Sequence, residues 1–100
     1  MDEPNDFEAV LKRLQIALHD TYGKLRAADA LALAGFKSSS YQRKMVVSRA
    51  LRELGWERGR FRFNGGMLYA YARGSQLERE VLLDVERGAD DRIVVKRREP

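Results

Sequence analysis

The hydrophobic pattern changes its period at Gly55, and this change constrains the fold more than any other feature of the chain. Across residues 47–54, apolar side chains recur at the three- and four-residue spacing of one helix face. Directly afterwards, Arg58, Arg60 and Arg62 alternate with glycine and phenylalanine, which is the period-two pattern of a strand. The sequence therefore predicts a helix that ends at a glycine and leads into a β-strand.

The predicted strand reaches a turn and returns. Asn64, Gly65 and Gly66 tolerate the positive backbone angles of a tight turn. Residues 67–72 then form a second apolar and aromatic run. We therefore expect a β-hairpin over residues 56–72.

A two-stranded hairpin is marginally stable by itself in water, so its apolar face must rest on other elements. Phe61 and Phe63 would form this contact together with Tyr69 and Tyr71, provided that the four aromatic side chains share one face.

An amphipathic helix is predicted near the N-terminus. Apolar residues recur at helical spacing between Phe7 and Leu18. Asn5 and Glu8 have the three-residue separation of a capping box. We expect a frayed segment at residues 1–5 and then a helix from about Asp6 to Asp20.

Two further helices are expected before the hairpin. Residues 24–26 form a brief extended stretch, and the alanine- and leucine-rich run Ala27–Ala34 favours a short helix that Gly35 ends. The next helix runs from about Ser40 to Leu54. At 100° per residue, its outer face would carry Tyr41, Gln42, Met45, Ser48, Arg49 and Arg52.

The last quarter of the chain fits two patterns. Ser75 and Glu78 resemble a capping box, and the apolar residues that follow fit a helix ending near Gly88. The run at residues 81–85 alternates equally well, and residues 92–96 have the composition of a strand. We favour the helix and retain a hairpin with its turn at residues 88–91 as the alternative.

The order of elements predicts an α+β chain with a winged helix-turn-helix fold. The second and third helices would form the helix-turn-helix, and the hairpin would be the wing. This domain of three helices and a two-stranded wing would cover residues 6–74, with a C-terminal helix or hairpin extension at residues 75–100.

One stretch resembles a known family. The run SRALRELGWERGRFRFNGG at residues 48–66, continued by Tyr69-Ala70-Tyr71, is similar to the winged-helix segment near the C-terminus of phage and plasmid primase–helicases of the virulence-associated-E type. In those proteins a helix ends in Leu-Gly-Trp and is followed by an arginine-rich strand, a glycine turn and an aromatic strand. The resemblance covers roughly residues 25–73 and implies a winged helix. The family's ATPase and primase domains have no counterpart in this sequence.

The charge is concentrated in the middle of the chain. Residues 37–73 hold nine lysines and arginines and two glutamates, a net charge of +7, whereas the whole chain has a formal net charge of +4. A localised basic patch is typical of contact with nucleic acid, although a solvated surface also produces charge runs.

The candidate nucleic-acid contacts lie on the third helix and the wing. Arginine pairs with guanine and glutamine with adenine in the major groove, hydroxyls at a helix N-terminus hold phosphates, and wing arginines reach the backbone or minor groove. The alternatives are a solvated helix face and charges that protect an edge strand. The candidates are Ser39, Ser40, Tyr41, Gln42, Arg43, Lys44, Arg49, Arg52, Arg58, Arg60, Arg62 and Asn64.

The composition argues against enzymes and cofactors. The chain has no cysteine and one histidine, which leaves no thiolate or histidine-rich metal site. Its glycines match neither a phosphate-binding loop nor a dinucleotide fingerprint. With an acidic start and no apolar run of membrane-spanning length, the sequence predicts a soluble cytoplasmic protein without a membrane partner.

The sequence supports three functional hypotheses. The first is a DNA-binding protein, with duplex DNA favoured, that acts in phage or mobile-element replication or in transcription regulation. The second is a small interaction module or inhibitor that binds a host protein complex through the same basic surface. The third is an oligomerising structural domain, such as a homodimer formed through residues 75–98.

Overall fold

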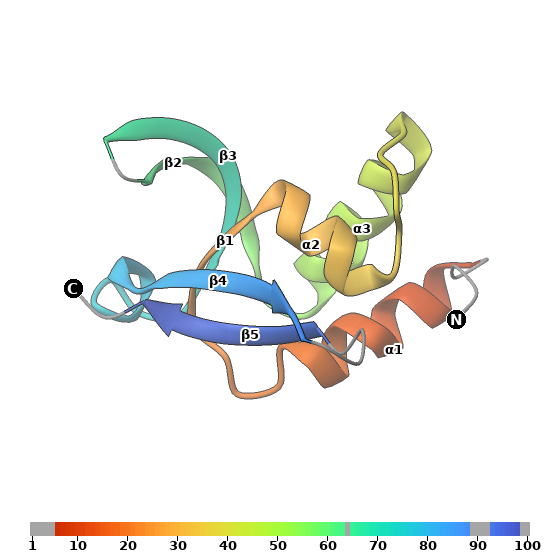
Figure 1. Cartoon of the computed structure of the whole chain (residues 1–100), viewed down its shortest axis with the longest axis horizontal. Coiled ribbons are helices and arrows are strands. Elements are labelled where there is room, and N and C mark those ends of the chain that lie inside the picture. The colour runs from red at the N-terminus through yellow and green to blue at the C-terminus, as the bar shows by residue number, and fades with distance from the viewer. Residues whose placement is uncertain (1–5, 64, 89–92, 99–100) are drawn as a thin grey trace.

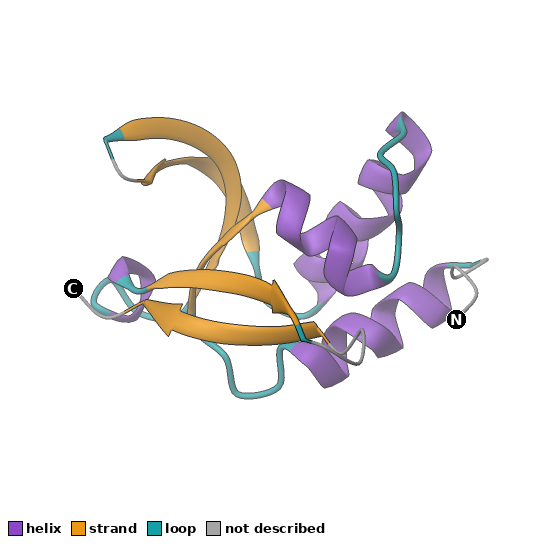
Figure 2. Ribbon diagram, viewed as in Figure 1, coloured by secondary structure: helices purple, strands orange, loops and turns teal. Residues whose placement is uncertain are grey.

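The computed structural model describes residues 6–63, 65–88 and 93–98. It is an α+β structure with three α-helices and a five-stranded mixed sheet (Figures 1 and 2). In chain order the elements are α1 (Phe7–Ala17), β1 (Gly23–Arg26), α2 (Ala27–Ala34), α3 (Tyr41–Glu53), β2 (Glu57–Phe63), β3 (Gly66–Arg73), the 3₁₀ helix η1 (Glu78–Glu80), β4 (Leu82–Arg87) and β5 (Ile93–Arg98).

Helix α1 begins at Asp6, whose carboxylate accepts a hydrogen bond of 2.9 Å from the Ala9 amide. The cap predicted at Asn5 lies outside the described residues. The helix ends at Ala17, before the expected Asp20, because Asp20 adopts a positive φ of 53° and the chain turns there. Leu18 nevertheless remains buried and continues the apolar face of the helix.

The extended stretch and the next two helices are confirmed. Helix α2 spans Ala27–Ala34 and ends at Gly35, which adopts the left-handed φ of 98°. Helix α3 begins after Ser40, whose hydroxyl accepts a hydrogen bond of 3.2 Å from the Arg43 amide. Helix α3 has 13 residues. Within the described ranges, no helix is long and apolar enough to cross a membrane.

The strand order is β2-β3-β1-β4-β5. Strand β1 pairs antiparallel with β3 and parallel with β4, through the pair of Lys24 and Leu82. Figure 1 shows the β2–β3 hairpin curving away from the three helices, while the β4–β5 hairpin lies across the front of the molecule. Gly23 fits this junction because a Cβ atom on it would lie 2.6 Å from the Val81 carbonyl oxygen.

The helix favoured for residues 75–88 is wrong, and the alternative hairpin is present. Ser75 and Glu78 do form the capping box, with a 2.8 Å bond from the Ser75 amide to the Glu78 carboxylate, but only the short η1 follows. Strands β4 and β5 then pair antiparallel, and the turn expected at residues 88–91 lies mostly outside the described residues. The strand is favoured because the edge of β1 is open to β4 and because alternation buries Leu83 completely.

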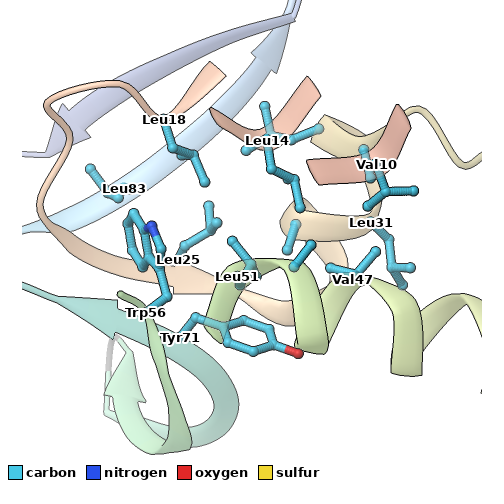
Figure 3. Close-up of a cluster of buried hydrophobic side chains, with 14 residues drawn as sticks. Val10, Leu14, Leu18, Leu25, Leu31, Val47, Leu51, Trp56, Tyr71 and Leu83 are labelled. Atoms are coloured by element: carbon cyan, nitrogen blue, oxygen red, sulfur yellow. The ribbon is translucent and has the colours of Figure 1, made fainter. Parts of the chain in front are cut away.

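The core joins both halves of the chain. Buried side chains from α1, α2, α3, β1, β3 and β4 point toward one another, and Trp56 lies at one side of this cluster near Leu25 and Leu83 (Figure 3). Trp56 is 1% exposed, which confirms its predicted place in the core. Among the described residues its indole N–H has no hydrogen-bond partner. Leu83 belongs to the same cluster, so the C-terminal hairpin is part of one core with the helices.

Candidate functional site

The pairing of the β2–β3 hairpin places arginines and tyrosines on one face. Arg58 pairs with Tyr71, Arg60 with Tyr69 and Arg62 with Met67. Directly paired residues of antiparallel strands share a face. One face of the hairpin is therefore both basic and aromatic.

The expectation that the phenylalanines and tyrosines of the hairpin share a face is therefore wrong. Phe61 pairs with Leu68 on the opposite face, where the Lys24 ammonium lies 5.9 Å from the centre of the Phe61 ring. The reason is the loop length. Phe63 pairs with Gly66, which leaves two positions between the strands, whereas a three-residue loop would have paired Phe61 with Tyr69.

Two guanidinium groups lie near the ring of Tyr69. The Cζ atoms of Arg58 and Arg60 are 5.3 Å and 5.8 Å from the centre of its ring, within the range of cation–π attraction. Tyr69 is 59% exposed, whereas Tyr71, one step nearer the helices on the same face, is 5% exposed. The face thus changes from an exposed cationic stack to a buried ring as it approaches α3.

The acidic residue of β2 is held away from this face. Glu57 pairs with Ala72, and its carboxylate lies 3.1 Å from the Arg79 guanidinium. The hydrogen bond from Arg79 and its positive charge lower the pKa of Glu57. The carboxylate is therefore ionised at neutral pH and bound to an arginine outside the hairpin.

Helix α3 exposes most of its predicted outer face. Tyr41, Gln42, Met45, Arg49 and Arg52 are all exposed. Ser48 was expected on the same face, but it is buried, at 7% exposed. Its position is on the flank of α3 beside the hairpin, where Tyr71 and Arg58 line the same hollow.

Two arginines of the predicted set are engaged with neighbouring segments. The Arg49 guanidinium stacks 4.5 Å from the centre of the Phe7 ring in α1. The Arg43 guanidinium donates to the backbone oxygen and hydroxyl of Ser38, at 3.0 and 2.6 Å, and lies over Phe36. Arg43 therefore stabilises the turn before α3, and Arg49 reaches toward α1.

A hollow of about 370 Å³ separates α3 from the hairpin. The start of α2 and Ser39 form its remaining sides. Helix α3 contributes Tyr41, Lys44, Met45, Val47 and Ser48, and the hairpin contributes Arg58, Tyr69 and Tyr71. Sequence reasoning missed Ser48 and the two tyrosines as site residues. The place of the tyrosines depends on the register of the hairpin, and that of Ser48 depends on how α3 packs beside it.

The basic side chains around this hollow lack acidic partners. Within the described ranges, no ion pair or hydrogen bond of a side chain is found for Lys44, Arg52, Arg58, Arg60 or Arg62. In contrast, Arg26, Arg79, Lys96 and Arg98 each contact a carboxylate. Five cations without a carboxylate partner therefore lie on the two neighbouring elements α3 and β2.

No family model, curated protein or solved structure matches the chain. The site must therefore be interpreted from its own chemistry. Across residues 6–63, 65–88 and 93–98, no three histidine, cysteine, aspartate or glutamate side chains are grouped as metal ligands would be. Of the predicted contacts, Ser40 is used as the cap of α3, Ser39 lines the hollow, and Asn64 lies outside the described residues.

Proposed function

We propose that this chain is a winged helix-turn-helix protein that binds nucleic acid, with duplex DNA as the favoured ligand, and that it is not an enzyme. The order α1-β1-α2-α3-β2-β3 and the strand order β2-β3-β1 support this assignment. In it, α2 and α3 are the helix-turn-helix and the β2–β3 hairpin is the wing.

The unpaired basic side chains on two neighbouring elements carry the proposal. Lys44 and Arg52 project from α3, and Arg58, Arg60 and Arg62 project from one face of β2. A cation without a carboxylate partner does not have to break an ion pair before it binds a phosphate. Its full Coulomb attraction to the phosphate therefore contributes to binding. This arrangement suits a polyanion that contacts the helix and the hairpin together.

In this arrangement α3 enters the major groove and the hairpin follows the flanking backbone. Gln42 and Arg52 are exposed on α3 and have the donor geometry that reads adenine and guanine. Arg60 and Arg62 contact phosphates or the adjacent minor groove. Arg49, which is exposed but stacked on Phe7, is placed for the backbone on the α1 side.

Fluorescence anisotropy with a labelled duplex of about 20 base pairs tests this function. We expect saturable binding at low salt, with a Kd in the micromolar range or tighter. Retention of the protein on an acidic polymer but not on DNA would contradict it. The position of the chain in replication or in transcription regulation follows from the sites it selects when DNA fragments are enriched on the protein.

A specific observation favours a second candidate function. Large apolar side chains are exposed around the same surface, and this is characteristic of a protein-binding patch. They are Tyr41, Met45, Met67 and Tyr69, exposed by 77, 54, 49 and 59%. A protein inhibitor or adaptor that uses this surface would bind an acidic partner, and Met45→Ala would weaken that complex more than it weakens DNA binding.

A further inference from the structure

The hollow between α3 and the hairpin has two hydroxyl groups in its lining that lack hydrogen-bond partners. Ser48 and Tyr71 are 7% and 5% exposed, and both line the hollow. Neither hydroxyl bonds to another described residue. The two hydroxyl oxygens are not among the buried unpaired atoms, so they reach the surface of the hollow and can bond to a molecule inside it. The floor of the hollow therefore presents hydrogen-bonding groups to whatever occupies it.

The walls of the hollow are flat and polarisable. Tyr41 comes from the first turn of α3 and Tyr69 from β3, and Met45 lies one helical turn after Tyr41. The Tyr69 ring lies within cation–π range of the guanidinium groups of Arg58 and Arg60. Figure 3 shows the Tyr71 ring beside α3 at the edge of the core cluster. Exposed aromatic rings that line a hollow are suited to stacking with a second planar group.

The charge of the hollow selects an anionic ligand. Lys44 and Arg58 line it, and none of the residues that line it is acidic. Its volume of about 370 Å³ lies near the lower end of small-molecule sites, which span ~300–1,000 Å³. A single nucleotide has all of these properties, because it combines a planar base with hydrogen-bonding edges and an anionic phosphate.

We propose that this hollow holds one unstacked nucleotide at the end of a bound DNA duplex. The base stacks on Tyr69 and Tyr41, the hydroxyls of Ser48 and Tyr71 bond to its edge, and Lys44 and Arg58 contact its phosphate. A base inside a duplex already has its two faces covered by its neighbours, so only an unpaired base can stack here. The inference rests on the proposed function and names the DNA structure that the protein prefers.

The test compares three labelled duplexes with the same paired region. One is blunt, one carries a two-nucleotide adenine overhang, and one carries an overhang of the same length without bases. The abasic overhang has the same phosphates, so its comparison with the adenine overhang isolates the base. We expect the full chain to bind the adenine overhang about tenfold more tightly than the abasic one. A 2-aminopurine at the overhang should lose fluorescence on binding.

Variants locate the effect at the hollow. Tyr69→Ala should abolish the tenfold preference between the adenine and abasic overhangs. Tyr71→Phe and Ser48→Ala should each reduce this preference by about threefold, with affinity for the blunt duplex retained. Tyr22→Phe is the matched control, because Tyr22 lies beside Arg73 outside the hollow. Equal affinity for the adenine and abasic overhangs would overturn the nucleotide site and leave the proposed function standing. Failure to bind any of the three duplexes would overturn both.

Discussion

Arg60 and Tyr69 are direct partners across the β2–β3 hairpin, and the guanidinium carbon lies 5.8 Å from the centre of the tyrosine ring. Arg58, two residues earlier on the same strand face, contacts the same ring at 5.3 Å. The electron-rich face of one tyrosine therefore stabilises two positive charges that would otherwise repel each other. This relationship keeps a row of cations ordered on an exposed strand without a carboxylate.

Reversing one charge in this row should weaken DNA binding. We expect Arg60→Glu to raise the Kd for a duplex by at least about tenfold in low salt, because it removes one phosphate contact and adds a repulsion. Lys12→Glu is the control, since it makes the same change of charge on the exposed side of α1. Anisotropy titrations measure both variants. Equal losses in the two would show that net charge, rather than this face, determines the affinity.

The affinity should depend steeply on salt. With about five phosphate contacts from α3 and β2, the logarithm of the binding constant should fall with the logarithm of salt concentration at a slope of about −4 to −5. The slope for Arg62→Ala should be smaller by about 1. Titrations at four salt concentrations between 50 and 300 mM (about the range in which counterion release is measured) give the slope. A slope near zero contradicts binding through these side chains.

The C-terminal hairpin should contribute to the stability of the whole domain. Leu83 is completely buried in the shared core, so Leu83→Ala should lower the free energy of unfolding by about 2–5 kcal/mol. Leu77→Ala is the matched control, because Leu77 is 79% exposed and its loss should change stability by less than about 0.5 kcal/mol. Urea denaturation followed by Trp56 fluorescence measures both. Similar unfolding midpoints for the two variants would contradict a shared core.

The junction of β1 and β4 should tolerate no side chain at residue 23. A Cβ atom at Gly23 would lie 2.6 Å from the Val81 carbonyl oxygen, at a φ of 134° that other residues avoid. We expect Gly23→Ala to destabilise the protein by about 1–3 kcal/mol more than Gly65→Ala, which has a positive φ but open space. Thermal unfolding by circular dichroism gives the comparison. A smaller loss of stability in Gly23→Ala than in Gly65→Ala would show that β1 and β4 can move apart to accept the extra methyl group.

Acid should weaken the turn at η1. The hydrogen bonds from the Ser75 amide and hydroxyl lower the pKa of Glu78 below its ordinary 4.5. A carboxyl group whose pKa is lower in the folded state stabilises that state above its unfolded pKa. This contribution is lost as the pH falls through the lower, folded value. Glu78→Gln should therefore show a smaller drop in urea midpoint between pH 6 and pH 3 than the wild type, and Glu80→Gln should behave as the wild type.

Local signals predicted the helices well. The ends of α2 and α3 follow from Gly35 and from the Ser40 cap, and both signals act within a few residues. The same kind of signal misled at Ser75 and Glu78, which form a real capping box that leads into a strand. Whether these residues continue as a helix or a strand depends on the open edge of β1, more than fifty residues earlier in the chain. The hydrogen bond between Arg26 and Asp84 beside this edge joins residues that are 58 positions apart.

The charged half of the candidate site was predictable and the hollow was not. Arginines at every second position indicate a basic strand face whatever its partner strand does. The loop length between the strands decides which aromatic residues share that face. With two residues in the loop Tyr69 lies on the arginine face, whereas with three residues Leu68 would lie there instead. Ser48 became part of the site for a different reason, because it lies on the flank of α3 that meets the hairpin.

The parallel contact between β1 and β4 also sets an order of assembly. The two hairpins and the three helices close through neighbours in sequence, but the Arg26–Asp84 contact beside this junction spans 58 residues, and loops of that length are slow to close. We therefore expect the joining of β4 to β1 to be a late step of folding, together with the non-local pairing of β1 with β3. The Lys24 amide, which donates to the Val81 carbonyl at 2.8 Å, exchanges its hydrogen with water only when this junction opens.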